Sequence, residues 1–98
     1  MAVLMLMQWD NVTQEQYDEV RRIVNFEGDA PKGGLFHMAG FSDKGLRVAD
    51  LWETAEDFQA FVEKRLMPGV AQAGITGEPK VEVWPAHNVF TPGYTVKT

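Results

Sequence analysis

Apolar side chains fill both faces of the first extended segment, and this feature most constrains the fold. Residues 1–9 read MAVLMLMQW, in which Gln8 is the only polar side chain. An apolar run of this length, followed by Asp10 and Asn11, is typical of a strand that is buried on both faces. Met and Leu also favour helices, but a helix start signal follows at once, so we predict a strand. Both of its faces must be covered, yet a chain of 98 residues buries only about 60–65 % of its surface by itself.

A helix is predicted to follow this strand, from about residue 14 to residue 25. Thr13 and Gln16 have the spacing of a capping box, in which each side chain accepts a hydrogen bond from the other residue's backbone N–H. Apolar residues then recur at helical spacing and form one stripe. These residues are Tyr17, Val20, Ile23 and Val24. Gly28 and Pro31 break the pattern beyond the predicted helix end.

A β-hairpin is predicted over residues 34–53. The segments 35–41 (LFHMAGF) and 46–52 (LRVADLW) have strand composition, and residues 42–45 (SDKG) between them are typical of a turn. The first of these strands is again apolar on both faces. One face holds Leu35, His37, Ala39 and Phe41, and the other holds Phe36, Met38 and Gly40.

A second helix is predicted to begin after Thr54, whose hydroxyl can cap the backbone N–H of Asp57. Its apolar face consists of Phe58, Phe61, Val62 and Leu66. We expect Pro68 and Gly69 to end this helix, with one more turn over residues 70–73.

A fourth strand over residues 81–84 completes the order β-α-β-β-α-β. This order predicts one ferredoxin-like α+β domain over residues 1–98, with an antiparallel four-stranded sheet and two helices on one face. The helices leave the second apolar face of the sheet uncovered. We therefore expect a homodimer through the sheet face and the C-terminal tail, residues 85–98. The alternative is that the tail itself folds over part of that face.

The element order, with LWET at residues 51–54 and EDF at residues 56–58, resembles the dimeric α/β-barrel superfamily. The branch it looks most like is the antibiotic-biosynthesis-monooxygenase type, which shares the Trp-Glu at the strand end and a helix carrying Phe. The resemblance implies a dimeric α/β barrel with a ligand cleft between each sheet and its own helices. It implies a small-molecule enzyme, such as a cofactor-independent monooxygenase or an isomerase acting on an aromatic or polyketide-like substrate. The alternatives are a non-catalytic ligand-binding or stress-related dimer, and a structural module without a cleft.

Haem-degrading members of this superfamily pair the strand-end Trp with an Asn on the first strand and a His on the second helix. Trp52 matches that Trp, but residues 58–64 (FQAFVEK) contain no His and residues 1–9 contain no Asn. We therefore expect no haem and no other cofactor.

His37 and Asp50 are the candidate catalytic pair. A two- or four-residue loop centred between Asp43 and Lys44 places them opposite each other, with Cβ atoms about 5 Å apart. An adjacent Asp fixes the tautomer of a His, which a general base requires. The alternative is a cross-strand pair that holds the register or lies at the dimer interface. A three-residue loop with a bulge at Gly45 would separate the two residues.

Four further residues are candidates for ligand binding. They are Trp52, Tyr17, Phe58 and His87. Trp52 shares a strand face with Asp50, where its indole can stack on a flat ligand, and Tyr17 and Phe58 lie on the apolar faces of the predicted helices. His87 follows Pro85 and is a candidate for the mouth of the cleft. For each of them the alternative is an ordinary core, surface or interface position.

Composition excludes several classes of function. Nine Lys and Arg against fourteen Asp and Glu give a net charge of −5, which argues against nucleic-acid binding because phosphate contact requires a basic surface. Cysteine is absent, and no His or acidic spacing indicates a metal site. No apolar run approaches the roughly 18 residues of a membrane span, and residues 1–9 lack the positive segment of a secretion signal. We therefore expect a cytoplasmic protein without membrane contact.

Overall fold

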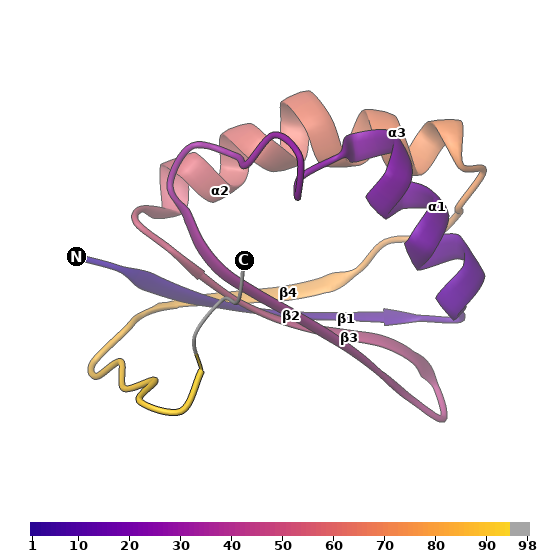
Figure 1. The fold of residues 1–98 in the computed structure, drawn as a ribbon. Helices are drawn as coiled ribbons and strands as arrows, with labels where there is room; N and C mark the ends of the chain where they lie inside the picture. The colour runs from indigo at the N-terminus through magenta and orange to yellow at the C-terminus, as the bar shows by residue number, and fades with distance from the viewer. Residues whose placement is uncertain (95–98) are drawn as a thin grey trace.

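The computed structural model describes residues 1–94, which form an antiparallel sheet with helices on one side (Figure 1). In chain order the elements are β1 (Val3–Asp10), α1 (Gln14–Val24), β2 (Gly34–Ser42), β3 (Gly45–Trp52), α2 (Ala55–Phe61), the π-helical segment η1 (Val62–Leu66), α3 (Met67–Gln72) and β4 (Lys80–Pro85). The strand order across the sheet is β2-β3-β1-β4, and each neighbouring pair is antiparallel. This arrangement confirms the predicted ferredoxin-like α+β fold.

Helix α1 begins where the sequence predicts it. The Oγ1 of Thr13 accepts the backbone N–H of Gln16 at 3.1 Å, and the Gln16 side chain accepts the backbone N–H of Thr13 at 3.0 Å. The helix ends at Val24 because Asn25 adopts the left-handed conformation, with φ of 54°, and its N–H donates to the carbonyl of Arg21. The capping box and this left-handed cap set the length of the helix.

The β2–β3 hairpin turns through two residues, Asp43 and Lys44, so that Ser42 pairs with Gly45. Gly45 has a φ of +141°, which L side chains rarely adopt. This short turn sets the register of the hairpin, and it pairs position 37 with position 50, as the sequence predicts.

The pairing of position 37 with position 50, continued along the strands, predicts Leu35 opposite Trp52, but a β-bulge at this end of the hairpin changes the register. The register shifts between Gly34 and Phe36, so that Gly34, and not Leu35, lies opposite Trp52. Leu35 is the extra residue and remains half-exposed. The bulge lies far from the turn, so the pairing nearer the turn is unaffected.

The second helical region runs on through Pro68 and Gly69, where the sequence predicts a helix end followed by one more turn over residues 70–73. Segments α2, η1 and α3 follow one another without a break, and Pro68 lies in the first turn of α3 (Met67–Gln72). The missing N–H of a proline is tolerated in such a first turn, and the π-helical segment directly before it rearranges the backbone hydrogen bonds. Gly69 lies against α1, where a Cβ would come within 2.6 Å of the Val24 Cγ2. The helix ends before Gly74, whose φ of +73° lies in the left-handed region that a helix cannot continue through.

The core lies on the helix-facing side of the sheet, which we call the inner face. Burial alternates along β1: Met5, Met7 and Trp9 are buried, whereas Leu6 and Gln8 are exposed. The buried set faces the helices, as the period of two in a strand requires.

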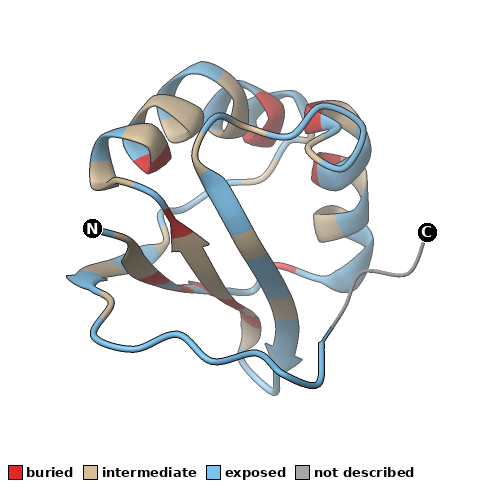
Figure 2. Cartoon of the chain, turned by 60° about the vertical axis from the view of Figure 1, so that its left-hand side comes forward, coloured by how far each residue is buried: buried red, intermediate tan, exposed pale blue. Residues whose placement is uncertain are grey.

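Among residues 1–94, no helix lies on the opposite side of the sheet, which we call the outer face (Figure 1). Strand alternation directs apolar residues onto it, namely Leu4, Leu6, Phe36, Met38, Leu51 and Trp84. The side chains of Met38 and Trp84 are 57 % and 47 % exposed, and Figure 2 shows the edge strand β2 as intermediate to exposed.

The described part of the C-terminal tail, residues 85–94, reaches the outer face at Phe36. Tyr94 packs edge-on against Phe36, with ring centroids 5.6 Å apart, whereas Phe90 is exposed. The part of the tail at residues 95–98 lies outside the described residues. The predicted second apolar face is thus present, and the predicted homodimer stays a prediction.

Candidate functional site

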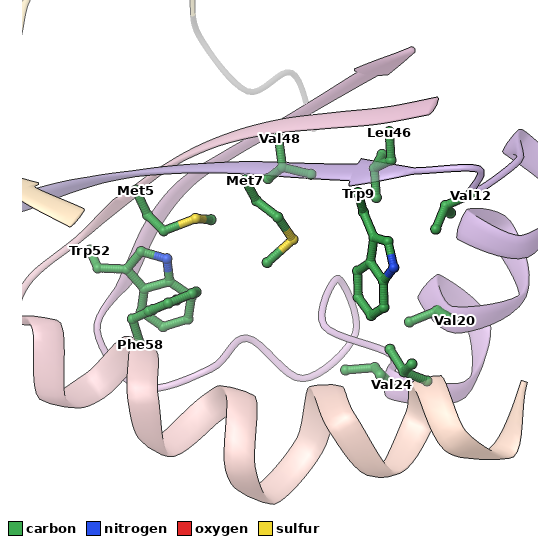
Figure 3. Packing of buried hydrophobic residues seen from close by; sticks show 11 residues of the cluster. Met5, Met7, Trp9, Val12, Val20, Val24, Leu46, Val48, Trp52 and Phe58 are labelled. Carbon is green, nitrogen blue, oxygen red and sulfur yellow. The ribbon is translucent and has the colours of Figure 1, made fainter. Parts of the chain in front are cut away.

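A cavity of about 440 Å³ lies between the inner face of the sheet and the helices. Figure 3 shows part of its walls: Met5 and Met7 project from the sheet, Trp52 and Phe58 meet at one end, and Trp9 stands at the other. Most of the lining side chains are apolar. A cavity of this size and character suits a small, flat and largely apolar ligand.

One wall of the cavity carries four hydrogen-bonded side chains, which we call the polar chain. Tyr17 comes from α1, His37 from β2, and Asp50 and Trp52 from β3. The Tyr17 Oη lies 2.6 Å from the His37 Nε2, and the His37 Nδ1 lies 2.6 Å from the Asp50 Oδ1. The Trp52 Nε1–H donates to the Asp50 Oδ2 at 3.0 Å. Helix docking and hairpin register together therefore connect three separate elements.

The Asp50 carboxylate sets the direction of these hydrogen bonds. An ionised carboxylate only accepts, so the His37 Nδ1 carries a proton and donates it to Asp50. In the neutral imidazole, the His37 Nε2 is then the acceptor for the Tyr17 hydroxyl. The Asp50 side chain is only 8 % exposed, while that of His37 is 34 % exposed, so the imidazole reaches from the shielded wall toward the opening.

Tyr17 is a neutral phenol in this arrangement. Burial raises the pKa of its hydroxyl above the ordinary value of 10.0, and the nearby Arg21 guanidinium opposes that rise. The Tyr17 and His37 rings are parallel to within 7°, with centroids 6.1 Å apart. The two rings therefore lie in similar orientations, and the Oη of Tyr17 is in hydrogen-bond contact with the His37 Nε2.

Aromatic side chains pack against His37 and Trp52 of the polar chain. The ring of Phe26 meets the imidazole of His37 edge-on at 5.1 Å between centroids. The Trp52 indole packs against Phe58 at 5.5 Å and against Phe61 at 5.4 Å. These contacts restrict rotation of the two rings that contact Asp50.

The loop between α1 and β2 supplies cavity residues that the sequence analysis missed. Phe26 and Glu27 both line the cavity. Glu27 accepts two hydrogen bonds from Arg21, one of them 2.8 Å between Nη2 and Oε2, and these lower the pKa of its carboxyl. Arg65 holds the loop by donating to one backbone carbonyl at the end of α1 and to another within the loop, at 3.0 and 2.7 Å. Irregular segments have no periodicity, so only the apolar character of Phe26 was a signal.

The structure brings together most of the residues singled out from the sequence. Those that line the cavity are His37, Asp50, Trp52, Tyr17 and Phe58. His87 is exposed in the segment after β4 and is not part of the cavity lining. The roles of all six residues in binding or catalysis stay predictions.

Within residues 1–94 no cluster of three or more His, Asp or Glu side chains is arranged to hold a metal ion. Over the same range, no helix has the length and apolar character needed to cross a membrane.

Comparison with known proteins gives matches in structure and none in sequence. A scan against protein-family models finds no match, and a search of curated proteins finds no significant one. SnoaB, a cofactor-independent oxygenase from Streptomyces nogalater, aligns with a TM-score of 0.61 at 10 % identity, over 90 % of this chain and 94 % of that chain. The monooxygenase ActVA-Orf6 of Streptomyces coelicolor, solved with nanaomycin D, aligns with a TM-score of 0.59 at 16 % identity, over 94 % and 92 %.

A proposed antibiotic biosynthesis monooxygenase from Nitrosomonas europaea aligns with a TM-score of 0.66 at 11 % identity, over 88 % of this chain and 90 % of that chain. The chain has the fold of the antibiotic biosynthesis monooxygenases. The resemblance read from residues 51–58 is therefore confirmed at the level of the fold. A protein of unknown function from Nitrosomonas europaea also aligns with this chain, with a TM-score of 0.64. The fold alone therefore does not assign an activity.

Proposed function

We propose that the chain is a small-molecule enzyme that binds a flat aromatic ligand in the inner cavity and removes a proton from it. The polar chain carries this proposal, because it offers a ligand's polar atom one hydrogen-bonding wall within an otherwise apolar cavity. His37 is the proton acceptor, and Asp50 holds its tautomer and stabilises the imidazolium that forms. Trp52 and Phe58 contact the faces of the aromatic ligand.

Loss of a proton is the first step of both reactions that the resemblance implies. An aromatic ketone or phenol that loses a proton becomes an electron-rich enolate or phenolate. Such an anion reacts with dioxygen in cofactor-independent oxygenation, or it takes up a proton at another carbon in isomerisation. The oxygenases SnoaB and ActVA-Orf6, which share this fold, support the first of these outcomes.

An exchange experiment tests proton removal without presupposing the later step. The probe is 2-tetralone, a bicyclic aromatic ketone with an acidic methylene between ring and carbonyl. In D2O under nitrogen, we expect the wild-type protein to speed exchange of the methylene hydrogens for deuterium, measured by NMR. His37→Gln should lower the rate about 100-fold or more. The matched control His87→Gln changes a histidine outside the cavity lining and should leave the rate unchanged. Equal rates for wild type and His37→Gln would contradict the proposal.

Ligand binding without catalysis is the second candidate function. One observation favours it: both ring nitrogens of His37 already lie within 2.6 Å of a partner. In this case 2-tetralone would quench the tryptophan fluorescence as it binds, and exchange would stay at the rate without protein.

We also propose that two copies of the chain pair through their outer faces and C-terminal tails. The support is the exposed apolar surface around Met38 and Trp84, beside which the described part of the tail packs Tyr94 on Phe36. Sedimentation velocity should show a dimer at micromolar concentration. A monomer under those conditions would overturn this part of the proposal.

A further inference from the structure

His37 presents no free nitrogen to the cavity. Its Nδ1 donates to Asp50 and its Nε2 accepts from Tyr17. Both carboxylate oxygens of Asp50 are engaged too, one by His37 and the other by Trp52. Tyr17, which lines the cavity, donates its single hydroxyl proton and retains acceptor capacity on Oη. Tyr17 is therefore the open end of the polar chain.

We propose that Tyr17 takes the proton from the ligand and passes its own proton to His37. This inference rests on the function proposed above and changes which atom meets the substrate. As the ligand's C–H or O–H bond breaks, its proton binds Tyr17 Oη. At the same time the Oη–H bond breaks, and that proton bonds to His37 Nε2. The electron pair stays on the ligand as an enolate or phenolate, Tyr17 is neutral before and after, and the positive charge resides on the imidazolium beside Asp50.

The geometry favours this relay over direct contact between His37 and the ligand. Direct contact requires the hydrogen bond between Tyr17 and His37 to break first, whereas the relay uses it as it stands. Its 2.6 Å length lies within the range for proton transfer, so the hydroxyl proton has a short path to the Nε2. Arg21, one helical turn beyond Tyr17, is paired with Glu27, so its charge is largely balanced beside the relay.

Removal of one oxygen atom tests the relay. Tyr17→Phe keeps the ring and deletes Oη, and we expect it to slow the deuterium exchange of 2-tetralone about 100-fold. The Kd of 2-tetralone, measured by fluorescence, should change by less than about threefold, because the apolar walls remain. The matched control is Tyr94→Phe, at the chain's only other tyrosine, which contacts Phe36 on the outer face. It should exchange at the wild-type rate.

Exchange by Tyr17→Phe at or above the wild-type rate would overturn the relay. The uncovered Nε2 of His37 would then be the direct base, and the proposed function would stand. A wild-type protein that bound 2-tetralone without catalysing exchange would instead contradict the proposed function, and the relay with it.

A double variant separates a relay from two independent contributions. Members of one proton path act as a unit, so Tyr17→Phe combined with His37→Gln should be no slower than the slower single variant. A purely structural role for Tyr17 would make the two losses multiply, and that result would overturn the relay. Circular dichroism of each variant would show whether a slower rate reflects the site or the fold.

Discussion

The two faces of one sheet differ in what covers them. On the inner face the helices leave a cavity, and α1 brings Tyr17 to within 2.6 Å of His37. The outer face also carries large apolar side chains, yet only Tyr94 of the described tail packs on it through an aromatic contact. Alternate residues of the same strands thus face a ligand-sized space on one side and open solvent on the other. An apolar strand face requires a cover, and the nature of that cover decides what the face does.

The largest expected difference between the faces is in stability. Trp52 on the inner face is 3 % exposed and packs on Phe58 and Phe61, so Trp52→Ala should lower the free energy of unfolding by about 3–5 kcal/mol. Trp84 on the outer face is the matched control. Trp84→Ala should cost less than about 1 kcal/mol at protein concentrations too low for association. Urea denaturation measures both, and equal losses would contradict the distinction between the faces.

The next largest effect concerns association through the outer face. Met38→Lys places a charge on that surface and should raise the dimer dissociation constant at least about tenfold, because two buried ammonium groups repel each other. Met67→Lys is the matched control, since Met67 is an exposed methionine on α3. Analytical ultracentrifugation distinguishes them. If both variants associated as the wild type does, the outer face would not be the interface.

A smaller effect is expected from Tyr17 in alkaline solution. Burial raises the pKa of its hydroxyl in the folded chain above 10.0, so the unfolded chain ionises first as the pH rises. The stability linked to this group is fully present below pH 10 and is lost as the pH rises through the folded pKa. Urea denaturation from about pH 9 to about pH 11 should show a steeper loss for the wild type than for Tyr17→Phe. Parallel curves would argue that the hydroxyl is not desolvated.

The smallest effect is expected at the mouth of the cavity. Hydrogen bonding to Arg21 lowers the pKa of Glu27 below 4.5, so this group stabilises the fold above that pH and the contribution is lost as the pH falls through the folded pKa. Both side chains are about half-exposed, and solvent screens their attraction. Glu27→Gln should therefore be slightly less stable than the wild type at neutral pH, and the difference should vanish in acid. A difference that persisted in acid would mean that Glu27 acts through packing instead of charge.

The sequence predicted those features of the molecule that depend on near neighbours. Thr13 and Gln16 marked the start of α1 because a capping box spans only three residues. The turn at Asp43 and Lys44 set the hairpin register, since each strand position follows from the one before it. The same local logic failed at Pro68, where the π-helical segment accommodates a residue that usually ends a helix.

Features without a local sequence pattern, or that depend on how the helices pack on the sheet, could not be predicted from the sequence. The bulge at Leu35 and the loop carrying Phe26 have no repeating pattern. Tyr17 was recognised as part of a helical stripe, but the same spacing suits a core residue. Its hydrogen bond to a strand twenty residues away depends on the angle and depth at which α1 packs on the sheet.

By itself, the sequence determined the order of the elements, the two apolar faces and the pairing of positions 37 and 50, because local capping, turn chemistry and strand alternation act over a few residues. Only the tertiary structure decided that the inner face encloses a cavity and that Tyr17 completes the polar chain. These two features depend on distances between separately formed layers, and such distances are set by the packing of many side chains at once.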